Sequence, residues 1–178
     1  MADHATRYTL MPIPPVEEHT SYFPAGPITI GVEYRLLNDE IVNRHMAVEQ
    51  QRADVGDGID DRGVSLHVFG TAHGGEHVEH LRFDCFEADP HYHYVNWGER
   101  ANDIVHIDPI ADGDPLAWAL DRIRTRLPQM LERAGAGDVA QRVDAGALEA
   151  ILPRVSEAAY RARYHHDDGA TLQGALTR

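Results

Sequence analysis

The spacing of apolar residues changes along the chain, from alternation in the middle to a helical period near the C-terminus, and this change constrains the fold most strongly. Runs rich in β-branched and aromatic residues, which are typical of strands, come first. We expect strands at 28–37, 64–71, 77–86, 91–97 and 104–110. Gly74-Gly75 and Asp89-Pro90 are short connections, and these favour antiparallel pairing in a meander.

The C-terminal third has the spacing of helices. Asp114-Pro115 is a strong helix start, because an aspartate N-cap precedes the residue best tolerated at the first helical position. A second helix is predicted to begin at Asp144. Pro128 and Pro153 lie inside the two apolar stripes, so both helices are expected to kink or break there. The order of elements predicts an α+β fold: an antiparallel meander of about five strands with two Pro-kinked C-terminal helices packed on one face.

The domain organisation is predicted from the length of the chain and from its proline-rich and non-periodic segments. At 178 residues the chain is about one domain long. Residues 1–27 are rich in proline and lack periodicity, so we interpret them as an extended N-terminal arm over the domain or toward a partner subunit. Residues 28–164 are predicted to form a single α+β domain, and 165–178 a flexible C-terminal tail. Residues 38–52 fit a short helix or a continuing strand.

Composition argues against several classes of partner. A formal net charge of −13 disfavours nucleic acid and anionic membranes, because binding to both depends on neutralising phosphate. We therefore expect a small-molecule ligand or a protein partner, with a homo-oligomer or a subunit of a complex left open. The single cysteine, Cys85, indicates a reducing compartment, and the first residues lack a secretory pattern, so we expect a cytoplasmic protein. The chain contains no lysine, which excludes lysine Schiff-base chemistry.

Seven of the twelve histidines lie between positions 67 and 106. Side chains two apart on a strand share a face, which gives this cluster a geometry. The face opposite the helices is predicted to carry His67, Asp84, His106 and Asp108. In one register of the next strand His91 and His93 join them, whereas in the other register Tyr92 and Tyr94 take their place.

Imidazoles beside a carboxylate are ligands for Zn²⁺, Fe²⁺, Mn²⁺ or Ni²⁺, so a divalent metal is the cofactor we expect, if any. The candidate metal ligands are His67, His91, His93 and His106. Four further residues are catalytic candidates. Asp84 and Asp108 are candidates for a metal ligand or a general base, and Tyr92 and Arg82 for groups that orient a substrate or stabilise an oxyanion. There are two alternatives for this cluster. The histidines could serve in acid–base catalysis without a metal, or they could simply lie on a solvent-exposed face of the sheet without a function.

The letters HGGEH at 73–77 match the inverted zinc-peptidase pattern HxxEH. That pattern needs both histidines on one helical face, and two adjacent glycines disfavour a helix. We therefore interpret this segment as the polar tip of a hairpin.

Three functions follow from these observations. The first is a small metal-dependent enzyme, a hydrolase or lyase acting on a small polar molecule. The second is a non-catalytic subunit or partner-binding module, with Trp97, Tyr92 and Tyr94 as interface anchors. The third is a protein that binds a small molecule without turnover.

Overall fold

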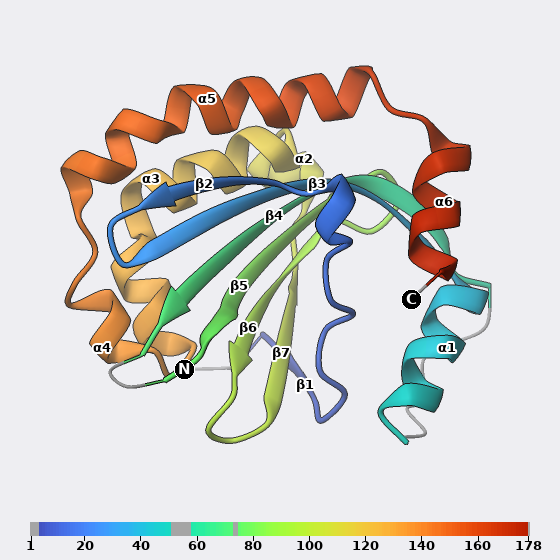
Figure 1. The fold of residues 1–178 in the computed structure, drawn as a ribbon, viewed down its shortest axis with the longest axis horizontal. Helices are drawn as coiled ribbons and strands as arrows, with labels where there is room; N and C mark the ends of the chain where they lie inside the picture. The colour runs from blue at the N-terminus through green and yellow to red at the C-terminus, as the bar shows by residue number, and fades with distance from the viewer. Residues whose placement is uncertain (1–3, 51–57, 73–74, 178) are drawn as a thin grey trace.

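The computed structural model describes residues 4–50, 58–72 and 75–177, in which one antiparallel sheet is flanked by helices (Figure 1). Its strands are β1 (Thr6–Tyr8), β2 (Ser21–Ala25), β3 (Ile28–Asn38), β4 (Asp60–Thr71), β5 (His77–Phe86), β6 (His91–Asn96) and β7 (Ala101–His106). They lie in the order β1-β7-β6-β5-β4-β3-β2. Strands β3 to β7 thus form the predicted meander, β2 extends it beside β3, and β1 pairs with β7 at the far edge.

The sheet has seven strands in the described residues, more than the predicted five, because the Pro-rich segment supplies β1 and β2. Pro24 is accommodated because β2 is an edge strand, where a missing N–H can face away from the ladder. The last strand ends at His106 rather than at 110. Pro109 cannot donate to a ladder, and Asp108 instead caps a short helix. The predicted turn at Gly74 and part of HGGEH fall at 73–74, outside the described residues.

The described helices are the 3-10 turn η1 (Glu17–His19), α1 (Asp39–Val48), α2 (Pro109–Asp112), α3 (Pro115–Arg133), α4 (Gly137–Ala140), α5 (Ala145–Tyr164) and α6 (Asp168–Leu176). Both predicted starts are confirmed: the carboxylates of Asp114 and Asp144 accept N–H bonds from the first turns of α3 and α5. The segment after Asn38 is helical, with Asn38 as its N-cap. Helix α6 occupies most of the segment predicted to be a flexible tail. No helix in the described ranges combines the length and apolar character needed to cross a bilayer.

The two helix-internal prolines do not end their helices. Helix α3 continues through Pro128 and α5 through Pro153, so of the predicted kink or break, the break does not occur. A proline costs about 3 kcal/mol in a helix interior. Burying each large aliphatic side chain contributes roughly 1.5–3 kcal/mol, and Leu127, Met130 and Leu131 are all buried around Pro128. The packing on both sides of the proline therefore outweighs its cost.

The hydrophobic core lies between one face of the sheet and helices α3 and α5 (Figure 1). Alternate residues of the central strands, such as Ile30, Leu66 and Phe83, are completely buried there. The residues between them are polar and point to the opposite face, and several are equally buried, for example Glu33, His67 and Arg82.

A segment of the N-terminal region covers that polar face. Strand β1 pairs at the β7 edge and β2 at the other, so residues 9–20 must cross the whole sheet between them (Figure 1). We call residues 9–20 the strap. Its backbone is held by side chains of the sheet and of α1: Arg35 and Arg82 donate to the Ile13 carbonyl, Asn102 to that of Leu10, and His45 contacts that of Met11.

Candidate metal centre

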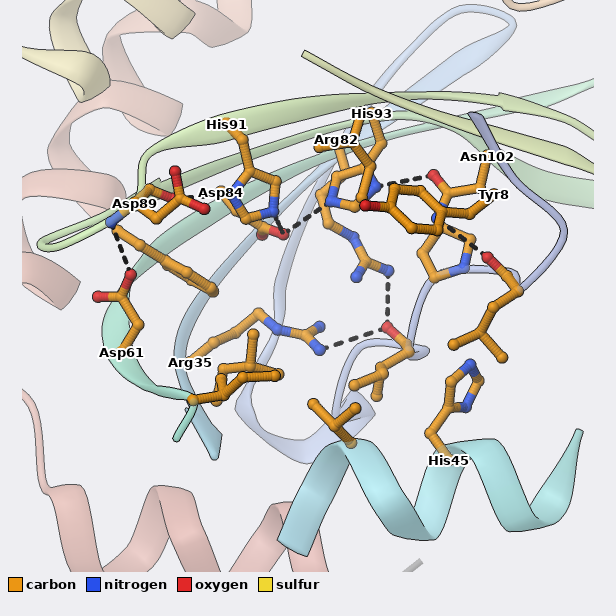
Figure 2. A pocket seen from close by; sticks show the side chains of 18 of the residues that line it. Tyr8, Arg35, His45, Asp61, Arg82, Asp84, Asp89, His91, His93 and Asn102 are labelled. Carbon is orange, nitrogen blue, oxygen red and sulfur yellow. Dashed lines mark hydrogen bonds and ion pairs between the residues drawn. The ribbon is translucent and has the colours of Figure 1, made fainter. Parts of the chain in front are cut away.

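A cavity of about 490 Å³ lies between the polar face of the sheet and the strap (Figure 2). Much of its wall is apolar, including Met11 and Ile13 of the strap, Val42 of α1 and Phe86 of β5. Its polar side chains include Arg35, His45, Arg82, Asp84, His91, His93, Asn102 and His106. The cavity is therefore an apolar chamber with a charged floor on the sheet.

Asp84, His91 and His93 meet on this floor (Figure 2). The register pairs Asp84 with His91 and Arg82 with His93, which places both histidines on the face of Asp84. Nε2 of His93 lies 3.1 Å, and Nε2 of His91 3.5 Å, from Oδ2 of Asp84. Ligand atoms from all three residues lie within 4.8 Å of one another, and all three side chains are buried. The group has the composition and spacing to hold a metal ion.

In both His91 and His93, the hydrogen bond of Nδ1 determines the tautomer of the ring and therefore whether Nε2, the nitrogen nearer Asp84, has a free lone pair. Nδ1 of His91 is 2.7 Å from the backbone carbonyl oxygen of Asp89. Nδ1 of His93 is 2.8 Å from Oδ1 of Asn102, whose amide nitrogen is occupied by the Leu10 carbonyl. Both partners are acceptors, so we assign a hydrogen to each Nδ1.

Each neutral ring therefore directs its Nε2 lone pair at a carboxylate. Three acceptor groups that converge in a buried place need a cation among them, either a proton or a metal ion. Outer hydrogen bonds of this kind are the usual means by which proteins orient imidazole ligands for a metal.

The charges around Asp84 keep it anionic. Burial by itself raises the pKa of this carboxyl, but the hydrogen bond with His93, which forms when a proton lies between the two groups, and the charge of Arg82 outweigh burial and hold the pKa well below its usual range. Its second oxygen, Oδ1, accepts a hydrogen bond from the hydroxyl of Ser65. Burial and the neighbouring His93 lower the pKa of His91, which favours the neutral ring that ligates metals.

His67 belongs to a separate buried group, which we call the His67 cluster: Glu33, Arg35, His67, Glu79 and Arg82. Nε2 of His67 is 3.2 Å from Glu33, and Nδ1 contacts Glu79. Arg35 pairs with Glu33 at 3.0 Å, and Arg82 makes a bidentate pair with Glu79 at 2.9 and 2.7 Å. Both ring nitrogens of His67 are therefore occupied by carboxylates, and the ring does not face Asp84.

A β-bulge explains how Glu79 enters this cluster. The pairing of β4 with β5 shifts between Val68 and Phe69, so that Val68 pairs with Leu81 and Phe69 with Glu79. His80 is the extra residue, and the shift moves Glu79 onto the polar face beside Arg82. Burial raises the pKa of Glu79, but Arg82 and His67 reverse this and lower it.

The other predicted site residues lie elsewhere. His106 lines the cavity rim, with its side chain 60% exposed and its Nδ1 2.7 Å from Oδ1 of Asp89. Asp108 has left the sheet and caps α2. Tyr92 points to the helix side, with its ring centroid 5.3 Å from that of Trp118, and Tyr94 is buried on the same side. Arg82 lines the cavity, as a member of the His67 cluster.

Sequence reasoning missed five residues that build the site: Glu33, Arg35, Asn102, Glu79 and Ser65. Glu33 and Arg35 carried a usable signal, since charged residues alternate with Ile30, Val32 and Tyr34 on one strand. Asn102 lay outside the predicted strand, and Glu79 needed knowledge of the bulge. Contacts of the strap depend on long-range topology and leave no local pattern.

Comparison with protein families gives one match. A family described as "Domain of unknown function (DUF7700)" matches residues 22–159. The matched span contains Asp84, His91 and His93 together with the whole His67 cluster. Comparison with curated proteins and with solved structures gives no match.

Proposed function

We propose that this chain, which belongs to the family described as a domain of unknown function (DUF7700), is a metal-dependent enzyme whose divalent ion is held by Asp84, His91 and His93. One observation carries the proposal: two imidazoles, each with Nδ1 bonded to an acceptor, direct Nε2 at the same carboxylate oxygen. This is a ligand set with its outer support already in place.

The donor set favours particular metals. Two imidazole nitrogens and one carboxylate oxygen suit Zn²⁺, Fe²⁺, Mn²⁺ or Ni²⁺ rather than Ca²⁺ or Mg²⁺, which prefer oxygen ligands. Three protein ligands leave coordination positions open, which is the pattern of catalytic rather than structural sites. A bound ion of this kind lowers the pKa of water or polarises a substrate oxygen, which supports a hydrolase or a lyase.

The cavity supports a small-molecule substrate. Its volume of about 490 Å³ falls in the usual range for small-molecule sites, roughly 300–1,000 Å³. The strap covers the metal ligands, and the amide of Asn102 connects the strap to His93. The side chains that would hold the ion are almost completely shielded from bulk water, which strengthens the electrostatic effect of an ion.

Metal content tests the proposal directly. Protein purified without a histidine tag and dialysed after incubation with Zn²⁺, Mn²⁺ or Fe²⁺ is expected to retain about one ion per chain. His93→Ala and Asp84→Ala should lose that ion, because each removes one of three ligands. The matched control is His106→Ala, which removes an exposed histidine at the rim of the same cavity and should leave the stoichiometry unchanged. Wild-type protein that retains no ion would refute the proposal.

A second function, binding without turnover, is supported by the same cavity. The two are separated by incubating metal-loaded protein with a mixture of small metabolites and following each by mass spectrometry. An enzyme consumes a compound, and the loss depends on the metal and on Asp84. A binding protein retains a compound on the chain without changing its total amount.

A further inference from the structure

We infer that the substrate of the proposed metal site is an organic anion, a carboxylate with a short apolar body; this inference rests on the proposed function. The cavity floor is assembled from charged side chains whose signs can be counted, and the count indicates what the site lacks once a metal is bound.

The buried floor carries one excess negative charge before a proton or a metal ion enters the Asp84 site. Four buried carboxylates belong to this floor: Glu33 and Glu79 of the His67 cluster, Asp84 of the candidate metal site, and Asp61 in the cavity lining. Three cations oppose them: Arg35, Arg82 and His67, whose two ring nitrogens both face carboxylates and therefore both carry hydrogen. The neutral rings of His91 and His93 add no charge when they ligate a metal.

A divalent ion at Asp84 leaves this floor with one uncompensated positive charge. Uncompensated charge in a buried site is unfavourable, so the metal-loaded site should take up an anion. The carboxylate of a substrate would neutralise this charge. A cationic substrate would add to the excess and is disfavoured.

Two guanidinium groups are in position to receive the carboxylate. Arg82 and Arg35 both line the cavity, and both donate through Nη2 to the carbonyl oxygen of Ile13, at 2.7 and 3.3 Å (Figure 2). The bonds of Arg82 use Nε and Nη2, so its Nη1 has no hydrogen-bond partner within the described ranges. Guanidinium groups recognise carboxylates by charge-assisted hydrogen bonds.

The acidic side chains at the cavity rim are already engaged. The carboxylate of Asp61 accepts N–H bonds from Arg62, Ala88 and Asp89. Asp89 pairs with His106, and Asp60 with Arg62. Asp89 and Asp60 are therefore paired with basic side chains, whereas Asp61 is held by backbone N–H groups and keeps the negative charge counted above. The remaining walls, such as Met11, Ile13 and Phe86, are suited to an apolar body attached to the carboxylate.

The test uses Co²⁺-loaded full-length protein and three probes of equal chain length: hexanoate, hexanol and hexylammonium. Calorimetric titration should show hexanoate binding about tenfold to a hundredfold more tightly than hexanol, the range expected for hydrogen bonds to charged groups. Hexylammonium should bind most weakly. Metal-free protein should lose most of the preference for hexanoate, and the visible spectrum of Co²⁺ should change with hexanoate alone.

A variant pair adds to the probe series. Arg35→Gln should lower hexanoate affinity while leaving hexanol affinity unchanged, and Arg161→Gln, an exposed arginine of α5, should change neither. The probe series on wild-type protein does not depend on the variants folding. If Co²⁺ binds at one ion per chain but hexanoate binds no better than hexanol, the inference is overturned and the metal site stands. If Co²⁺ does not bind, the proposed function fails, and this inference fails with it.

Discussion

At the scale of residues, the metal centre depends on Asn102 as much as on its three ligands. Oδ1 of Asn102 accepts from Nδ1 of His93 while its amide nitrogen donates to Leu10, so the two bonds fix both the orientation of the amide and the tautomer of the imidazole. A residue that never contacts the ion thereby controls which nitrogen of His93 is free to bind it.

Replacing Asn102 is therefore expected to weaken metal binding. Asn102→Ala should reduce the affinity for Zn²⁺ about 10–100-fold, the usual cost of removing an outer hydrogen bond to a histidine ligand. Asn102→Asp retains an acceptor at the same place and should recover most of the affinity. Competition with a chromogenic chelator measures both, with Asn43→Ala on the exposed side of α1 as the control. Unchanged affinity in Asn102→Ala would show that the tautomer is fixed by other means.

At the scale of elements, the pairing of β4 with β5 sets the position of Asp84. Ser65 lies opposite Asp84 in the register, and Gly63 pairs with Phe86 two residues farther along. A Cβ at Gly63 would lie 2.8 Å from the Cα of Phe86 and would also meet the backbone of Cys85. The two strands can approach this closely because position 63 has no side chain.

Gly63→Ala should consequently destabilise the sheet. Overpacking of this kind costs about 1–3 kcal/mol, and the strands must separate at the end nearest Asp84, so metal affinity should fall as well. Gly137→Ala is the control, because a Cβ at Gly137 meets nothing within 4 Å. Urea unfolding of the two variants gives the comparison. Equal free energies of unfolding would contradict this account of the β4–β5 pairing.

Much of the fold was predictable because its signals are local. The bounds of β5 and the starts of α3 and α5 follow from alternation and from aspartate N-caps. Strands β1 and β2 were missed because edge strands rich in polar residues and proline have no clear period. The site was predictable in part: alternation placed Asp84 and His93 together once the register was known. The position of Glu79 and the path of the strap were not predictable, because the β-bulge and the crossing of the sheet depend on tertiary packing.

At the scale of the whole molecule, the sheet separates two kinds of interior. One face is an ordinary apolar core with α3 and α5. The other is a buried layer of paired charges beneath the strap. Buried ion pairs contribute little net stability, and removing one partner is costly because it leaves an unpaired charge. We therefore attribute the polar layer to function and expect acid to disrupt it.

Glu33 gives that acid sensitivity a direction. Burial raises its pKa, but Arg35, His67 and the backbone N–H of Val16 outweigh burial and lower the pKa from 4.5 to about 2. A depressed pKa contributes stability above the unfolded value, and this stability is lost as the pH falls through the folded value. We expect the free energy of unfolding to drop by about 3 kcal/mol between about pH 5 and pH 2 on account of this group. Glu33→Gln should flatten the profile in that window, and an unchanged profile would contradict the assignment.

The position of a bound metal ion is the most direct test of the central claim. Crystals of untagged protein grown with Zn²⁺ should give an anomalous scattering peak about 2.0–2.2 Å from Oδ2 of Asp84 and from Nε2 of His91 and His93. His67 should remain between its two carboxylates, without contact to the ion. A peak that instead lies beside His67 or His106, or no peak within reach of Asp84, would contradict the account.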